Sequence, residues 1–179
     1  MSRAFVKEDS QTEAPVMAHR APLPPGVPNY VTPRGLAHLR EELVDLLAEL
    51  QTAEPVELPE AHRARSLALM TRKLELEERL ASAVLVERTP ENQGEVRFGA
   101  NVTVRIDAHS SSAAKTRVYQ LVGADEADPQ QGRIAFFTPI ARALIGRSVG
   151  DEVQIQTPRG EETLAIISVN YDSSPSSSR

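Results

Sequence analysis

The chain has no cysteine and no tryptophan, and only four Phe and three Tyr occur among its 179 residues. Without cysteine, disulfides, thiol nucleophiles and thiolate metal sites are excluded. So few aromatic rings argue against a surface that stacks the bases of single-stranded nucleic acid. The four histidines, His19, His38, His62 and His109, do not have the spacing of metal ligands.

Positive charge is also scarce: 20 Lys and Arg face 25 Asp and Glu, which gives a net charge of −5. A protein that binds nucleic acid phosphates on its own usually has the opposite balance. No run of about 18 apolar residues occurs, and the opening MSRAFVKEDSQTEAP has acidic residues where a signal peptide needs apolar ones. We therefore expect no membrane association and a cytoplasmic protein.

The N-terminal part divides into a leader and a helical hairpin. Five prolines before residue 30 predict a flexible leader over 1–30. Thr32 and Pro33 then have the chemistry of a helix N-cap and first helical residue. The following leucines are spaced three, four, three and four residues apart, which is a heptad seam; they are Leu36, Leu39, Leu43, Leu46 and Leu50.

Two prolines interrupt this pattern in TAEPVELPEA at 52–61, and a second helical run follows over 62–87. There the same rhythm is carried by Leu67, Met70, Leu74, Ala81 and Val84, with Glu77 at one seam position. Two heptad helices joined by a short turn predict an antiparallel coiled-coil hairpin over 31–88, with its tip at about 52–61.

Beyond residue 94 the hydrophobic period changes to two. Turn-forming sequences separate five predicted strands, at 101–107, 116–122, 133–138, 152–157 and 162–171. One short helix is expected over 139–145, with proline at its start and Gly146 after its end. The fold class is therefore α+β: a helical hairpin followed by a small antiparallel sheet domain at 95–172, and a disordered tail at 173–179.

Several stretches resemble one family of bacterial proteins. YQLVGADEADP at 119–129 and GRIAFFTPIARALIGRSVGDEVQIQTPRGEE at 132–162 are similar to the C-terminal domain of the GreA/GreB transcript cleavage factors. NYVTPRGLAHLREEL at 29–43 resembles the opening of their first helix, RFGANVTV their second domain, and MSRAFVKED the leader of GreB-like members. The resemblance implies that the sheet domain is FKBP-like.

It also implies a function. Such factors bind bacterial RNA polymerase with the globular domain outside and the coiled coil in the secondary channel, where acidic tip residues help to hold a Mg²⁺ ion. Hard Mg²⁺ prefers carboxylate oxygens, and two-metal hydrolysis then cuts the backtracked RNA. The polymerase is the nuclease, so we expect this protein to be no enzyme, to have no cofactor of its own, and to meet RNA and DNA only within the elongation complex.

The tip departs from the family pattern. Cleavage-stimulating members carry an Asp followed three residues later by Glu, whereas this tip offers Glu54, Glu57 and Glu60 beside two prolines. The arms also look about two turns shorter, or ~10 Å less reach. These glutamates are either metal ligands or part of a solvated loop, and we expect weak or no RNA cleavage.

Three arginines, Arg65, Arg72 and Arg79, recur every seven residues and so share one helical face. By the resemblance, this stripe contacts RNA or the channel walls. The alternative is a charged outer face paired with Glu75 and with acidic residues of the first helix.

Phe137, Thr138 and Pro139 align with the Asp/Asn-Ser-Pro element through which family members dock on the polymerase. Phe137 departs from that pattern and is either an apolar anchor for the partner or part of the core. The acidic run at 125–128 lacks the glycine and distal glutamate of an EF-hand loop, so a solvated turn is expected.

Three other functions stay open. A cleavage-inactive occupant of the secondary channel would compete with active factors. A peptidyl-prolyl isomerase would need an aromatic-lined pocket, and fold alone does not confer that activity. A pure interaction module would pair its coiled coil with another helix; for the leading interpretation we expect a monomer.

Overall fold

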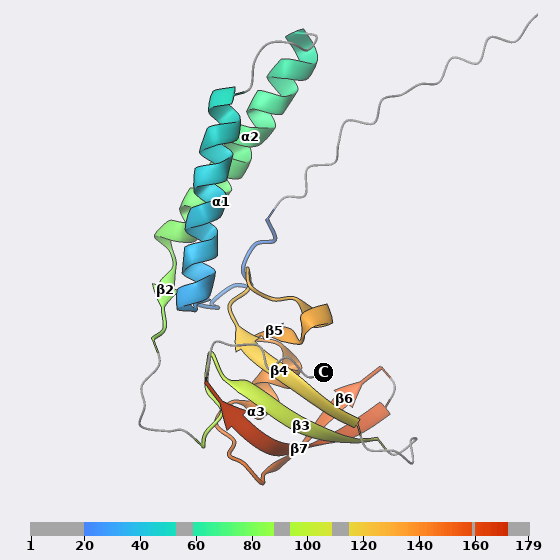
Figure 1. Ribbon diagram of the computed structural model, residues 1–179. Helices are drawn as coiled ribbons and strands as arrows, with labels where there is room; N and C mark the ends of the chain where they lie inside the picture. The colour runs from blue at the N-terminus through green and yellow to red at the C-terminus, as the bar shows by residue number, and fades with distance from the viewer. Residues whose placement is uncertain (1–19, 53–58, 88–93, 109–114, 159, 172–179) are drawn as a thin grey trace, which may run out of the picture.

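A computed structural model describes residues 20–52, 59–87, 94–108, 115–158 and 160–171. Two long helices lie side by side and project from a curled sheet (Figure 1). This arrangement confirms the predicted α+β class, with the hairpin before the sheet domain. The leader before residue 20, the centre of the tip and the tail after residue 171 lie outside the described residues.

Helix α1 (Pro33–Thr52) begins where its capping chemistry predicts. The hydroxyl of Thr32 accepts a hydrogen bond from the backbone N–H of Gly35 at 3.0 Å, which satisfies one of the donors left open at a helix start. Helix α2 (Pro59–Ala81) also begins with a proline. Of the two prolines of the predicted tip, Pro59 starts a helix and Pro55 lies outside the described residues.

The hairpin core confirms the seam of the first helix and corrects that of the second. Leu39 and Leu46 of α1 pack with Leu69 and Leu76 of α2, which are 2% and 0% exposed. The predicted seam residues of α2 face solvent instead, with exposures of 68% for Leu67, 57% for Met70 and 66% for Leu74. Both rows have heptad spacing, and only packing against α1 selects between them.

The second helix is also shorter than predicted, because it ends at Ala81 and not at Glu87. Strand β2 (Val84–Leu85) follows and pairs in parallel with β1 (Tyr30–Val31). The N–H of Val84 donates to the carbonyl of Asn29 at 2.8 Å. Val84 is β-branched and suits a strand better than a helix.

The predicted leader over 1–30 is wrong for its described part. Asn29 is buried and its side-chain amide donates to the carbonyl of Arg79 at 2.7 Å. Residues 20–29, which we call the strap, run beside α2 before β1 begins (Figure 1). The prolines exclude helix there but do not prevent packing.

The sheet has the strand order β5-β4-β3-β7-β6, in which only the β4–β5 pair is parallel. Its strands are β3 (Asn101–Ala108), β4 (Lys115–Val122), β5 (Arg133–Ala135), β6 (Glu152–Thr157) and β7 (Gly160–Asn170). The 3₁₀ helix η2 (Pro129–Gln131) precedes β5, and α3 (Pro139–Leu144) follows it. All five predicted strands and the short helix are confirmed, and the FKBP-like topology stays a prediction.

One strand ends earlier than predicted. β5 stops at Ala135, and the next two residues form a turn in place of the expected strand to 138. The N–H of Thr138 donates to the carbonyl of Ala135 at 2.9 Å, and Thr138 then caps α3. Because this turn breaks the alternation of faces, Phe136 and Phe137 are both half-buried.

Candidate functional site

Aromatic rings from both parts of the molecule meet where the hairpin joins the sheet domain. The ring of Tyr30 lies 5.8 Å from that of Phe98 and 5.2 Å from that of Phe136, measured between centroids. The contact of Tyr30 with Phe98 is edge-to-face, and such contacts add about 0.5–1.5 kcal/mol beyond area burial. The isomerase alternative needs rings that line a pocket, whereas these rings pack on one another.

Arg20 of the strap connects the hairpin to the sheet domain. One terminal nitrogen of its guanidinium bonds Glu42 of α1 at 2.5 Å, and the other bonds Asp125, in the loop after β4, at 2.5 Å. Burial lowers the pKa of Arg20, but these hydrogen bonds outweigh it, and the net shift is upward. Paired in this way, the partly buried charges of Arg20, Glu42 and Asp125 link the hairpin to the sheet domain.

Glu126 makes a second connection at the same junction. Its carboxylate accepts from the N–H of Thr32 at 3.1 Å and from the hydroxyl of Thr32 at 2.5 Å. A side chain at Gly35 would overlap that carboxylate. Asp125 and Glu126 of the acidic run, which was expected to be a solvated turn, are therefore part of the interface between the hairpin and the sheet domain.

The three arginines of the predicted stripe have different environments. Arg65 bonds Glu49 at 3.2 Å and Arg72 bonds Glu42 at 2.9 Å, with both arginine side chains 49% exposed. These pairs join α2 to α1, as the alternative interpretation predicts. Enough of Arg65 and Arg72 is exposed for the contact with RNA or the channel to stay a prediction.

Arg79 requires a correction, because its side chain is only 7% exposed. Its Nε lies 3.5 Å from a carboxylate oxygen of Asp125, and its Nη2 donates to the carbonyl of Ala21 at 2.5 Å. A guanidinium held in this way has almost no surface to offer to RNA or to a channel wall. Arg79 instead joins α2 to the strap and to the loop after β4.

At the tip, only Glu60 belongs to the described residues, and it is exposed in the first turn of α2. A carboxylate there is favoured by the positive end of the helix dipole. Glu54 and Glu57 lie outside the described residues. Within the described ranges, no three His, Asp or Glu side chains gather as a metal site.

The predicted docking element forms the start of α3. The hydroxyl of Thr138 accepts from the N–H of Ala141 at 3.4 Å, and Pro139 is exposed at the first helical position. Phe137 stands edge-on to Phe136, with 5.5 Å between ring centroids. The element is held by the cap of α3 and is partly exposed, while its docking role stays a prediction.

Residues that sequence patterns missed are Arg20, Gly35 and Glu126. Arg20 and Asp125 are separated by 105 positions, so no local spacing could have indicated their contact.

None of the helices in the described ranges has the length and apolar character to cross a membrane.

Comparison with known proteins identifies the family of this chain. The family model described as "Transcription elongation factor, GreA/GreB, C-term" matches residues 91–171. Transcription elongation factor GreA of Vibrio cholerae is 42% identical over 140 residues, which cover 76% of this chain and 87% of the relative. Its counterpart in Brucella canis is 34% identical over 156 residues, covering 79% and 96%.

A solved GreA/GreB factor from Nitrosomonas europaea is similar with a TM-score of 0.37 at 21% identity, over 81% of this chain and 99% of that one. Given the identity to the curated relatives over most of both chains, the protein belongs to the GreA/GreB family.

Proposed function

We propose that this protein is a transcription elongation factor that binds bacterial RNA polymerase and inserts its helical hairpin into the secondary channel. The relatives in Vibrio and Brucella carry the name transcription elongation factor GreA. The observation that carries the proposal is the hairpin itself, which projects from the sheet domain (Figure 1) and is tied at its base by Arg20 and Thr32. Because these contacts hold the base of the hairpin against the sheet domain, docking of the sheet domain would set the position of the hairpin tip.

In this proposal the sheet domain docks through Phe137, Thr138 and Pro139. Thr138 and Pro139 are committed to the start of α3, so the backbone of the element is preorganised, which lowers the entropy lost on binding. The half-exposed ring of Phe137 supplies an apolar contact of the kind that often dominates interfaces. The protein is then a cytoplasmic binding partner and not itself an enzyme.

The tip decides what the bound factor does. The Mg²⁺ ion belongs to the polymerase, and carboxylates are ligands of the kind it accepts; here Glu54, Glu57 and Glu60 are the residues that would approach it. The tip sequence has no aspartate, and a glutamate carries one more methylene than an aspartate and so directs its oxygens differently. This difference favours the second candidate, a cleavage-inactive competitor for the channel.

Binding is tested by co-purification of the full chain with bacterial RNA polymerase. Phe137→Ser should reduce the amount retained by about tenfold, as loss of an aromatic anchor costs 1–2 kcal/mol or more. Phe98→Leu, at the aromatic junction, is the matched control and should leave retention unchanged. Equal retention of all three proteins would remove the docking assignment, and no retention of any would contradict the proposed function.

A further inference from the structure

One side of the hairpin exposes a row of large apolar side chains. Of the eleven large apolar side chains exposed in the described part of the chain, five belong to α1 and α2. They are Val44 and Leu47 of α1 and Leu67, Met70 and Leu74 of α2. Single exposed apolar residues are ordinary, whereas a contiguous group with polar surroundings marks an interaction surface. The positions of these five on their helices show that they are neighbours.

Helix geometry places all five on the same side of the hairpin, which we call the open side. At about 100° of rotation per residue, the three exposed residues of α2 lie about 100–160° from the buried Leu69. In α1, Val44 and Leu47 lie at about the same angles, in the same sense, from the buried Leu46. Because the two helices run antiparallel, the same sense of rotation leads to the same side.

Two ion pairs give the alignment of the helices and lie on the other side, which we call the paired side. Arg65 of α2 pairs with Glu49 of α1. One heptad further along α2, Arg72 pairs with Glu42. Both arginines lie about 40–60° from Leu69 in the opposite sense of rotation. The pairs set the apolar residues of the two helices at the same height, over about two turns.

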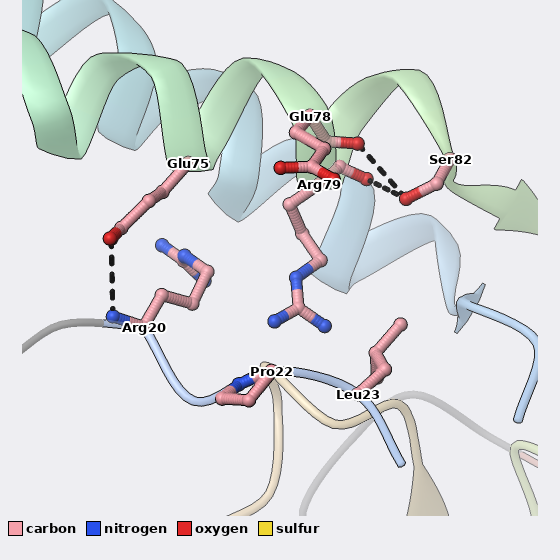
Figure 2. A pocket seen from close by; sticks show the side chains of 7 residues that line it. All are labelled: Arg20, Pro22, Leu23, Glu75, Glu78, Arg79 and Ser82. Atoms are coloured by element: carbon pink, nitrogen blue, oxygen red, sulfur yellow. Dashed lines mark hydrogen bonds between the residues drawn. The ribbon is translucent and has the colours of Figure 1, made fainter. Parts of the chain in front are cut away.

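The strap covers the paired side and leaves the open side to solvent. Figure 2 shows the strap beside the part of α2 that carries Glu75 and Arg79, and the N–H of Arg20 donates to Glu75 at 3.3 Å. Arg20 also bonds Glu42, the partner of Arg72. The five apolar residues, in contrast, remain 38–68% exposed. Because apolar surface is unfavourable in water, a partner that buries it would be bound favourably.

The spacing of the row indicates that the partner is a helix. Leu67, Met70 and Leu74 are three and four residues apart, which is the spacing that packs one helix along another. A buried row on the same helix, with Leu69 and Leu76, already packs on α1. Helix α2 therefore has the pattern of a helix that packs between two others, as in a helical bundle.

The charges beside the row favour an acidic partner. Arg40 and Arg63 lie on the open side, at about 120° from the buried row, and both are exposed without an ion pair or hydrogen bond within the described part of the chain. Nearby, Lys73 and Glu77 pair with each other at 2.7 Å, and Glu78 lies on the back of α2, at about 180°. Unpaired positive charges therefore flank the row on a chain whose net charge is −5, and acidic residues on the partner would complement them.

A second copy of the chain fits the open side poorly. Two-fold pairing of the row with itself brings Arg40 of one copy either to Arg63 or to Arg40 of the other, so that like charges meet. The row is also only ~10 Å long, which is short for an interface that holds two chains together alone. It suits a contact within a complex that other contacts also hold.

We propose that the open side of the hairpin binds an amphipathic α-helix of the polymerase that has acidic residues beside its apolar row. The source of this helix rests on the proposed function, in which the sheet domain docks outside and the polymerase surrounds the inserted hairpin. The helix packs its apolar side chains against Met70 and Leu74. Its acidic residues lie near Arg40 and Arg63, which are about 15–20 Å apart along the hairpin.

Titration of labelled full chain with polymerase tests the apolar contact. The double variant Met70→Gln, Leu74→Gln should bind about tenfold more weakly, because two apolar side chains no longer gain burial in the complex. The matched control is Val118→Gln, Ile167→Gln, which changes two exposed apolar residues of the sheet domain and should bind as the wild type does. Urea unfolding should show similar stability for all three proteins, since all four positions are exposed. Equal affinities of the three proteins, or equal weakening in both variants, would overturn the proposal.

A charge reversal tests the acidic character of the partner. Arg40→Glu should weaken binding about fivefold, as for loss of an exposed ion pair. Arg34→Glu is the matched control, because Arg34 is exposed on the same helix but lies about 120° from Leu46 in the opposite sense. An equal effect of the two reversals would show that the open side meets no acidic residue.

Photo-cross-linking identifies the occupant. A benzophenone amino acid replaces Met70 in the full chain bound to polymerase, or Asp45, which is exposed on the paired side, as the control. We expect position 70, and not position 45, to cross-link a polymerase helix that carries acidic residues. Retention of polymerase with no such cross-link, or a cross-link from position 70 to residues 1–19 or to a second copy, would refute the assignment. Failure of the wild type to retain polymerase contradicts the proposed function instead, so the two failures are distinguishable.

Discussion

The carboxylate of Glu126 occupies the space into which a side chain at Gly35 would project, so α1 and the loop after β4 lie in direct contact. This contact depends on the absence of a Cβ atom at position 35. It joins two parts of the chain that the resemblance treats as separate domains. The orientation of the hairpin therefore depends on polar contacts at its base as well as on the aromatic contacts of Tyr30.

The first prediction concerns the contact between Gly35 and Glu126. The effect of Gly35→Ala on the free energy of unfolding should change sign when Glu126 is removed. Gly35→Ala alone should destabilise the protein by about 1–2 kcal/mol, because Glu126 must leave the N–H and hydroxyl of Thr32. In a Glu126→Ala background the same substitution should stabilise it, by up to about 1 kcal/mol from helix propensity. Urea unfolding of the four proteins measures both values, and destabilisation of equal size in both backgrounds would refute the contact.

The second prediction concerns the register of the hairpin. Leu69→Ala should cost about 2–5 kcal/mol, because Leu69 is buried against α1. Leu67→Ala removes the same atoms from an exposed position on the same helix and should change stability by less than about 0.5 kcal/mol. Thermal or urea unfolding distinguishes them. The reverse order would restore the seam predicted from the sequence.

The third prediction is a pH dependence at Glu42. Burial raises the pKa of this carboxyl group, but hydrogen bonds from Arg72 and Arg20 outweigh it, and the net shift is downward from 4.5. A lowered pKa means that the contribution to stability is present above pH 4.5 and is lost as the pH falls through the pKa in the fold.

Glu42→Gln should therefore be less stable than the wild type at pH 7, by about 1–3 kcal/mol. The two proteins should converge once the pH has fallen below the lowered pKa of Glu42 in the fold. Urea unfolding at a series of pH values measures the difference. A gap that stays constant from pH 7 to pH 3 would show that Glu42 is not charged and paired in this way.

The fourth prediction concerns the end of β7. The hydroxyl of Tyr171 donates to the carbonyl of Glu95 and accepts from the N–H of Arg97 at 3.1 Å. Tyr171→Phe should cost about 1–2 kcal/mol. Burial, the largest effect, raises the pKa of Tyr171 above its ordinary value of 10.0, so this contribution is complete below pH 10 and is lost as the pH rises through the raised pKa.

Unfolding of wild type and Tyr171→Phe at pH 8 and pH 11 measures this contribution. Because the variant lacks the titrating group, the difference between the two proteins should shrink at the higher pH. An unchanged difference would contradict the bonding of the hydroxyl.

Local patterns predict the start of α1 to the residue and its buried face, since the cap at Thr32 and the leucine spacing act within one helix. They predict the wrong face of α2 because its sequence contains two apolar rows, and the choice depends on the partner helix. They miss the end of α2, where pairing of Val84 with the strand before α1 outweighs helical spacing. The contacts of Arg20 and Glu126 join residues far apart in sequence, which no spacing rule detects.

Cleavage of RNA in backtracked elongation complexes, driven by an active Gre factor, tests the central claim most directly when this protein is added in increasing amounts. If its hairpin occupies the secondary channel without supplying carboxylate ligands to the Mg²⁺ ion of the polymerase, it displaces the active factor. The cleavage rate should then fall toward that of the polymerase alone. A rate that stays unchanged at a large excess of the protein would contradict binding in the channel.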